Sequence, residues 1–187
     1  TTANSGTRFQ NHRAESVFAD PKEKEIHFRQ PVMTETIVNQ AGTKSLARTL
    51  AALAKPRDVI LLYGDLGMGK TVFSRAFVQS LTSPDEDVPS PTFTLVQLYD
   101  TDKGTIWHFD LYRLKQPDEV YELGFEEALS DGISLIEWPE RAERLYPRNR
   151  LEIRITAGDT PDERRIALIP HGDGWNKRLE NLSWRTD

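Results

Sequence analysis

The chain has 187 residues, of which 37% are hydrophobic and 28% charged, and this length suits one domain with a substantial core. Its net charge of −5 argues against a bulk electrostatic attraction to nucleic acid, while leaving room for a local basic patch. The absence of cysteine excludes disulfides and thiolate metal sites and suits a cytoplasmic protein. No apolar run approaches the ~20 residues that span a bilayer, so we expect no membrane association.

Residues 1–30 differ from the rest because their apolar side chains are scattered without a period. A secretory signal needs an apolar block, which this stretch lacks. Arginines without acidic residues over 1–14 are a feature of transit peptides, but a flexible extension is the simpler interpretation. We therefore divide the chain into an N-terminal extension, 1–30, and a domain, 31–187.

The domain begins with a predicted helix within residues 43–56, TKSLARTLAALAKP, where Leu46, Leu50 and Leu53 share one face. Residues 58–63, DVILLY, form a continuous apolar run. Such a run is typical of a strand that is buried on both faces.

Residues 64–71, GDLGMGKT, fit a phosphate-binding loop and lie between that strand and a helix expected over 71–81. Glycines let backbone N–H groups converge on an anion, and the helix N-terminus adds partial positive charge. Lys70 can reach the β- and γ-phosphates, and the Thr71 hydroxyl can bind Mg²⁺. The nucleotide-binding residues predicted here are Gly64, Asp65, Leu66, Gly67, Met68, Gly69, Lys70, Thr71 and Val72.

The base is inferred by elimination. Guanine-specific P-loop proteins of the Ras type usually carry an Asn-Lys-x-Asp element. The nearest match, at residues 176–179, reads NKRL and lacks the acid. We therefore expect ATP and Mg²⁺ as the cofactors.

Two acidic residues follow the loop at predicted strand ends. A hairpin is expected from strands 92–99 and 105–110, and its second strand ends in Asp110. A second buried-strand run, 132–138, contains Glu137 near its end. An acid after an apolar strand is what a P-loop enzyme uses to hold Mg²⁺. The alternatives are that Asp110 only caps or pairs with a neighbour and that Glu137 is an exposed strand end.

Other polar and aromatic residues of this region have simpler interpretations. We expect His108 to be packed or hydrogen-bonded in the hairpin rather than to be a ligand. Trp107 and Trp138 are expected in the core or an interface rather than stacked on a base. Arg113 is the one candidate for an arginine finger, but pairing with Asp110 or Glu122 is its simpler role.

The remaining pattern completes the fold. A helix is predicted over 116–129, paired strands over 151–156 and 164–170, and a short amphipathic tail helix that carries Trp175, Leu179 and Leu182. The fold class predicted is α/β: a single P-loop NTPase-like domain with a mixed sheet, helices on both faces and added antiparallel hairpins.

The motifs GDLGMGKT, SPTFTL, HFDLYR and LIEWPER occur in this order, and together they resemble the TsaE family, the ATPases of bacterial tRNA threonylcarbamoyladenosine synthesis. The resemblance covers roughly residues 32–170. It is specific, because motifs beyond the phosphate loop are not general features of P-loop proteins.

The resemblance implies an ATPase that works beside the TsaB and TsaD proteins, which modify the tRNA adenosine next to the anticodon. The ATPase would meet tRNA only through that complex and would support repeated turnover rather than the transfer itself. Lys70, Asp110 and Glu137 would be catalytic, and Thr71 with Glu137 would hold the metal. Asp110 would be needed for hydrolysis, either by activating the attacking water or by contacting the metal. Thr92 would contact the nucleotide from a switch-like segment, residues 90–92, which includes Ser90 and Pro91.

Two other functions stay open at this point. A P-loop small-molecule kinase shares the loop and the size, but it usually needs an arginine-rich lid, and only Arg141 and Arg144 follow Glu137 closely. A nucleotide-gated binding module would hydrolyse little and act through its conformation.

Overall fold

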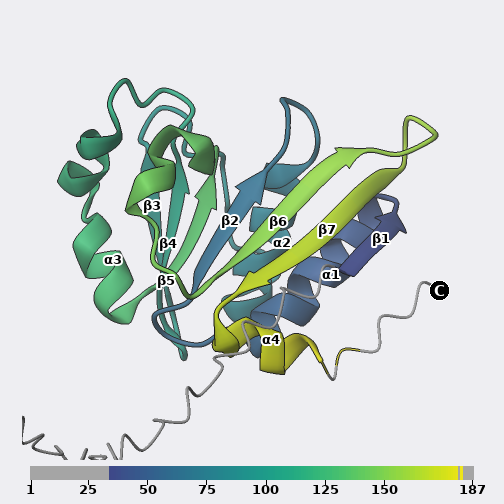
Figure 1. Cartoon of the computed structure of the whole chain (residues 1–187), viewed down its shortest axis with the longest axis horizontal. Coiled ribbons are helices and arrows are strands. Elements are labelled where there is room, and N and C mark those ends of the chain that lie inside the picture. Colours follow the sequence, from purple (N-terminus) through teal and green to yellow (C-terminus); the bar gives the residue numbers. More distant parts are fainter. Residues whose placement is uncertain (1–33, 181, 183–187) are drawn as a thin grey trace, which may run out of the picture.

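Seven strands form one mixed sheet in the order β1-β7-β6-β2-β5-β4-β3 (Figure 1). The computed structural model describes residues 34–180 and 182, so the extension predicted over 1–30 lies outside the described residues. The strands are β1 Thr34–Val38, β2 Val59–Tyr63, β3 Val96–Thr101, β4 Gly104–Asp110, β5 Ile133–Glu137, β6 Arg150–Ala157 and β7 Arg164–His171. The helices are α1 Gln40–Leu53, α2 Lys70–Leu81, α3 Phe125–Asp131 and α4 Asp173–Leu179, with the 3₁₀ segments η1 Pro117–Leu123 and η2 Pro139–Leu145.

The centre of the sheet is parallel. Strand β2 pairs in parallel with β5 and β6, and β5 pairs in parallel with β4. Antiparallel strands extend both sides, since β3 pairs with β4, and β7 lies between β6 and β1. The carboxyl ends of β2, β4 and β5 therefore meet at one edge of the sheet, where ligands of open parallel sheets bind.

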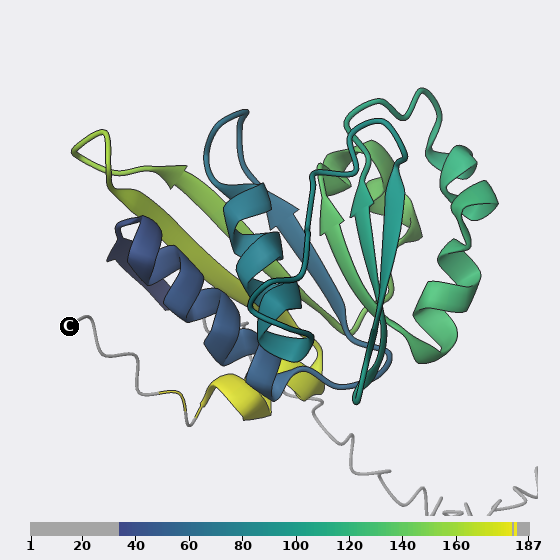
Figure 2. The ribbon, with the colours of Figure 1, turned by 180° about the vertical axis from the view of Figure 1, so that it is seen from behind.

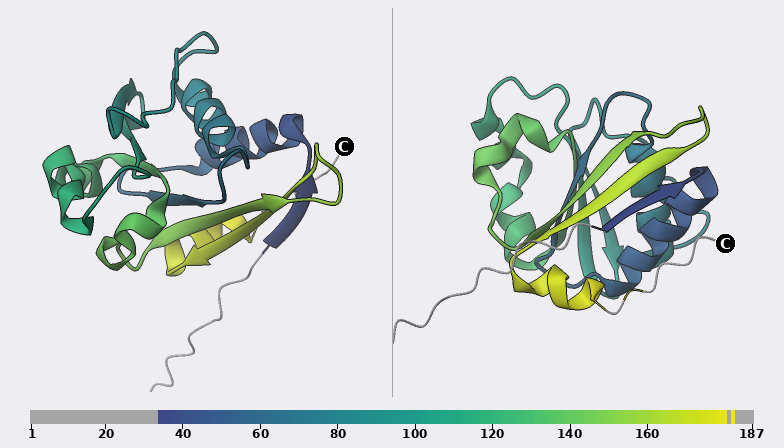
Figure 3. Two further views of the ribbon diagram at one scale, coloured as in Figure 1. Left: turned by 90° about the horizontal axis from the view of Figure 1, so that it is seen from above. Right: turned by 45° about the vertical axis from the view of Figure 1, so that its right-hand side comes forward.

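Helices cover both faces of the sheet, which confirms the predicted fold class. Helices α1 and α2 pack on one face, in front of the sheet in Figure 2, over the larger hydrophobic cluster. The other face carries α3 and the two 3₁₀ segments over a second cluster (Figure 3, left). Strand β2 is buried because it lies between both layers, which explains its continuous apolar sequence.

The first strand of the predicted hairpin starts later than expected. Residues 92–95 are not strand: Leu95 adopts the left-handed region, with φ 67°, and donates its N–H to the Pro91 carbonyl at 2.7 Å. Strand β3 therefore begins at Val96, and the turn to β4 is shorter than the predicted 100–104. Because residues 90–95 are not part of the strand, they can lie across the end of β4, where the Asp110 N–H donates to the Leu95 carbonyl at 3.0 Å.

The helix predicted over 116–129 is also interrupted. Gly124 has φ 82° and separates η1 from α3. A Cβ at Gly124 would lie 2.7 Å from the Trp107 ring, so glycine is needed for close packing as well as for its conformation. Gly124 ends η1 in the left-handed region, and its close contact with Trp107 leaves no room for a larger residue at the break.

The two ends of the described chain differ from expectation in detail. The edge strand β1 was not predicted, because it is short and takes its structure from pairing with β7. The tail helix exists as α4 and buries Trp175, whereas Leu182 lies beyond its end. Over residues 34–180 and 182, no helix combines the length and the apolarity needed to cross a membrane.

Candidate active site

The loop of residues 64–71 leaves β2 and turns directly into α2. Gly64, Gly67 and Gly69 all have positive φ, at 155°, 80° and 102°. A Cβ on Gly64 would lie 2.6 Å from the Ile155 carbonyl oxygen, so the neighbouring strand β6 also requires glycine there. The glycine spacing in the sequence is therefore a backbone requirement of this loop.

Lys70 is the first residue of α2 and only 5% exposed. Its ammonium donates to the carbonyl oxygens of Gly64 and Asp65, the latter at 3.0 Å, and lies 3.9 Å from the centroid of the Trp138 ring. Burial lowers the pKa of Lys70, and the carboxylate of Glu137 partly offsets this. The loop carbonyls thus hold the Lys70 ammonium at the edge of the sheet where the parallel strands end.

Glu137 ends β5 and is 1% exposed, which excludes the alternative of an exposed strand end. Its Oε2 accepts from the Thr71 hydroxyl at 3.0 Å. Its Oε1 lies 2.9 Å from both Ser74 Oγ and His108 Nε2. A buried carboxylate with three polar partners is well satisfied.

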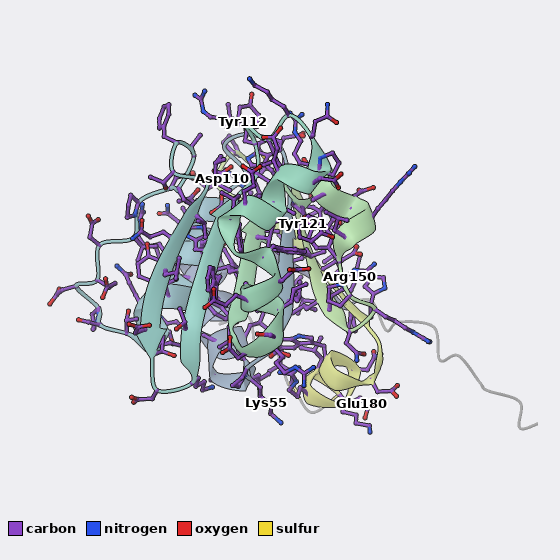
Figure 4. All side chains as sticks on the ribbon, turned by 90° about the vertical axis from the view of Figure 1, so that its left-hand side faces the viewer. Lys55, Asp110, Tyr112, Tyr121, Arg150 and Glu180 are labelled. Atoms are coloured by element: carbon purple, nitrogen blue, oxygen red, sulfur yellow. The ribbon has the colours of Figure 1, made fainter. Side chains whose placement is uncertain are left out.

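Asp110 ends β4 and is 3% exposed. Its Oδ2 accepts from the hydroxyls of Ser90 at 3.1 Å and Thr92 at 3.0 Å, and its Oδ1 accepts from the Tyr112 N–H at 3.0 Å. Asp110 therefore ties the predicted switch segment, 90–92, to the strand end. Figure 4 shows Asp110 and Tyr112 close together at the top of the molecule in that view, far from Lys55 and Glu180.

These side chains share one cavity of about 320 Å³. It brings together the three predicted catalytic residues, both predicted metal ligands and Thr92. Its lining is Leu66, Gly67, Gly69, Lys70, Thr71, Val72, Ser90, Thr92, Asp110, Tyr112, Glu137 and Trp138. Among the predicted nucleotide residues, Gly64, Asp65 and Met68 are outside this lining.

A second cleft of about 440 Å³ lies on the other side of the loop and shares Gly67, Gly69 and Val72 with the first. Met68 belongs here, and the opposite walls come from the start of α1 and the β6–β7 turn. Arg164 lines it and donates from Nε to the Met68 carbonyl at 3.2 Å. The sequence did not indicate this cleft, because its walls are far apart in the chain and carry no motif.

Several side chains have roles that the sequence left open. His108 is both buried and hydrogen-bonded, as expected, and Trp107 is in the core. Trp138 packs against the same core cluster and also borders the cavity, with its ring 4.8 Å from that of Tyr112. Arg113 lies over the Phe93 ring at 4.4 Å, and among the ion pairs of the described residues none joins it to Asp110 or Glu122. Ser74 was missed, and its position one helical turn after Lys70 was the available signal.

The cavity fits a Mg²⁺ site of the P-loop type. Mg²⁺ is usually held by one or two carboxylates with substrate phosphates and water, not by a cage of protein ligands. The oxygens of Thr71 and Glu137 lie side by side, next to Lys70, and would supply such ligands. Within the part of the chain that the structure describes, no group of three or more His, Cys, Asp or Glu residues is placed to form a cage.

Comparison with known proteins identifies the relatives of this chain. Residues 37–166 match the family model of TsaE, the threonylcarbamoyl adenosine biosynthesis protein. The tRNA threonylcarbamoyladenosine biosynthesis protein TsaE of Rickettsia bellii is 44% identical over 141 residues, which cover 75% of this chain and 96% of that protein. The protein of the same name in Bacillus subtilis is 40% identical over 148 residues, covering 78% and 90%. The crystal structure of Bacillus subtilis YdiB superposes with a TM-score of 0.66 at 34% identity, over 83% of this chain and 97% of that one.

Proposed function

Because this chain belongs to the TsaE family of threonylcarbamoyl adenosine biosynthesis proteins, we propose that it is a Mg²⁺-dependent ATPase of tRNA threonylcarbamoyladenosine biosynthesis. The observation that carries the proposal is the convergence of Lys70, Thr71, Asp110 and Glu137 on one cavity over the 64–71 loop. These residues come from three elements that meet at the carboxyl edge of the sheet.

In the proposed function, the loop binds the phosphates of ATP. The start of α2 offers backbone N–H groups and the positive end of its dipole. Lys70 moves its ammonium from the loop carbonyls to the phosphate oxygens, which are stronger, charged acceptors. The adenosine part extends into the second cleft, where Asn39 and Arg164 offer polar groups beside the loop.

Thr71 and Glu137 hold the metal in this account. The Thr71 hydroxyl offers one oxygen and the Glu137 carboxylate another, with their atoms 3.0 Å apart. When bound there, Mg²⁺ would supply charge neutralisation to the phosphates. Glu137 keeps its position without the metal because Ser74 and His108 hold its other oxygen.

Asp110 is assigned to orient the attacking water. Its carboxylate ends the strand next to Glu137, and the two residues are register partners. The hydroxyls of Ser90 and Thr92 now fill its Oδ2. A shift of the 90–92 segment would exchange one of these hydroxyls for water, which gives the switch-like segment a defined chemical role.

Hydrolysis by the isolated chain is expected to be slow, and the TsaB–TsaD complex is the proposed partner. An arginine finger raises phosphoryl-transfer rates by ~10³–10⁵. The cavity of about 320 Å³ over the 64–71 loop is called the phosphate cavity from here on. No arginine belongs to the residues that line it, and Arg113 is stacked on Phe93. The family resemblance supports TsaB–TsaD as the partner, with tRNA met through that complex.

A phosphate-release assay tests the proposal. The full chain is incubated with Mg²⁺ and ATP, alone, with TsaB–TsaD, and with candidate small-molecule acceptors. We expect slow release alone and a changed rate with the partner complex. Phosphate transfer to an acceptor instead of release would favour the kinase alternative. Nucleotide binding without release under any condition would favour the nucleotide-gated binding module.

A further inference from the structure

The two oxygens of the Glu137 carboxylate have different surroundings. Oε2 meets the Thr71 hydroxyl, and Thr71 and Glu137 both line the phosphate cavity. Oε1 points the other way, toward Ser74 and His108, and neither of these residues lines the cavity. The carboxylate is therefore held with one oxygen toward the cavity and the other in the protein interior.

His108 is an unusual choice for its position in the sheet. It lies in β4, is 0% exposed, and has Ile106 and Leu135 as buried apolar neighbours along and across the strand. Its Nε2 is 2.9 Å from Glu137, while Nδ1 is buried with no hydrogen-bond partner among the described residues. An unpaired buried nitrogen costs free energy, so packing alone would be served better by an apolar side chain.

The direction of the bond follows from the chemistry of the pair. A carboxylate in its ionised form only accepts hydrogen bonds, so such a carboxylate is joined to His108 when Nε2 carries the proton and donates it. A carboxylate that receives a donor on its inner oxygen is fixed in rotation, which leaves the outer oxygen aimed at Thr71. Histidine–carboxylate contacts behind metal ligands act in this way, and their loss typically weakens metal affinity by about 10- to 100-fold.

We propose that His108 is a positioning residue that fixes Glu137 so that a single carboxylate oxygen faces the metal side of the cavity. The role of His108 toward Mg²⁺ rests on the proposed ATPase function. The orientation of Glu137 by the Nε2–H donor does not, because it is a property of the protein without nucleotide. Ser74 assists from α2 but lacks the rigid ring.

The first test compares ATP affinity with and without Mg²⁺ in variants of the full chain. His108→Leu removes the donor and keeps an apolar side chain in the core, and we expect about a 10- to 100-fold loss of affinity in Mg²⁺ with little change in its absence. His108→Gln places an amide N–H near the position of Nε2 and should recover most of that loss. Ser134→Ala, which alters a buried polar side chain of β5 outside the cavity, should behave as wild type.

Unchanged Mg²⁺-dependent affinity in a folded His108→Leu variant would overturn the proposal. Equal losses in the Leu and Gln variants, with and without Mg²⁺, would also overturn it, because such losses indicate a structural role only. If the wild-type chain binds no ATP at all, the proposed function fails instead, and the positioning role is judged by the second test.

The second test needs no nucleotide. A long-range ¹H–¹⁵N correlation spectrum of the wild-type chain reports which ring nitrogen of each histidine is protonated, and His108→Gln assigns the signals of His108. We expect a proton on Nε2 that exchanges slowly with solvent and becomes exposed to exchange in Glu137→Ala. A ring protonated only on Nδ1 would contradict the proposed donor. This spectrum also decides the matter if His108→Leu does not fold.

Discussion

Asp110 and Glu137 are register partners at the ends of the adjacent parallel strands β4 and β5. Both carboxylates are nearly fully buried, yet each accepts hydrogen bonds from a different segment. Glu137 is tied to α2 through Thr71 and Ser74, and Asp110 is tied to the 90–92 segment. One acid is therefore joined to the phosphate loop and its helix, and the other to a segment outside the regular strands.

Replacement of Lys70 should weaken nucleotide binding. Lys70→Ala removes charge-assisted hydrogen bonds to phosphate, each worth about 1.5–3 kcal/mol, which corresponds to roughly a 10- to 100-fold loss of ATP affinity. Calorimetric titration of the full chain with ATP and Mg²⁺ measures it. Lys55→Ala, an exposed lysine outside the cavity, is the control and should bind as wild type. Equal ATP affinities of the two variants would show that Lys70 does not contribute to nucleotide binding.

Glu137→Gln should separate metal binding from phosphate binding. The amide keeps the size of the side chain but loses the charge that attracts Mg²⁺. We expect the affinity for ATP to fall in the presence of Mg²⁺ and to stay near wild type in its absence. Titrations at fixed ATP with varied Mg²⁺ measure the difference. A variant with normal Mg²⁺ dependence would show that Glu137 serves only the packing of β5 against α2.

Gly124→Ala should destabilise the fold. The left-handed conformation disfavours alanine, and the added Cβ would meet the Trp107 ring at 2.7 Å. Strain and overpacking each cost about 1–3 kcal/mol. Urea unfolding of the variant measures the loss. Gly174→Ala, at a helical position of α4 where the nearest contact is Arg178 at 3.5 Å, should leave stability unchanged or slightly raise it. If the two variants have the same free energy of unfolding, the requirement for glycine at position 124 is contradicted.

Glu152 should stabilise the fold in a pH-dependent manner. Burial alone would raise the pKa of Glu152, but hydrogen bonds from Arg150 and Arg154 outweigh burial and lower it below its ordinary value of 4.5. The folded state therefore binds fewer protons than the unfolded state in acid, and stability falls as protons are added. We expect the stability difference between wild type and Glu152→Gln to be fully present above pH 4.5. It should shrink as the pH falls through the folded-state pKa. A difference that stays constant in acid would contradict this.

The sequence predicted the parts of the site that are local in the chain. The loop from Gly64 to Thr71 has a backbone requirement at each glycine, so its pattern alone indicates its conformation, while its phosphate ligand stays a prediction. Glu137 and Asp110 were found because each ends a strand. Their pairing side by side could be predicted only conditionally, since it depends on β4 running parallel to β5.

The remaining features depend on contacts between distant segments. Strand β1 exists because β7 pairs with it, and the close packing at Gly124 comes from Trp107 of another strand. The contact of His108 with Glu137 joins residues 29 positions apart. Local propensity carries no information about such contacts, which is why the sequence placed His108 in the hairpin but not beside Glu137.

Single-turnover hydrolysis by wild type and Asp110→Asn, in the presence of TsaB–TsaD, tests the central claim most directly. The variant keeps the size of the side chain but removes the carboxylate that would orient water. The account predicts that both proteins bind ATP with Mg²⁺ equally well, that wild type converts bound ATP to ADP and phosphate, and that the variant does so ~10²–10⁴-fold more slowly. Equal hydrolysis rates in the two proteins would return Asp110 to a structural role and contradict the account.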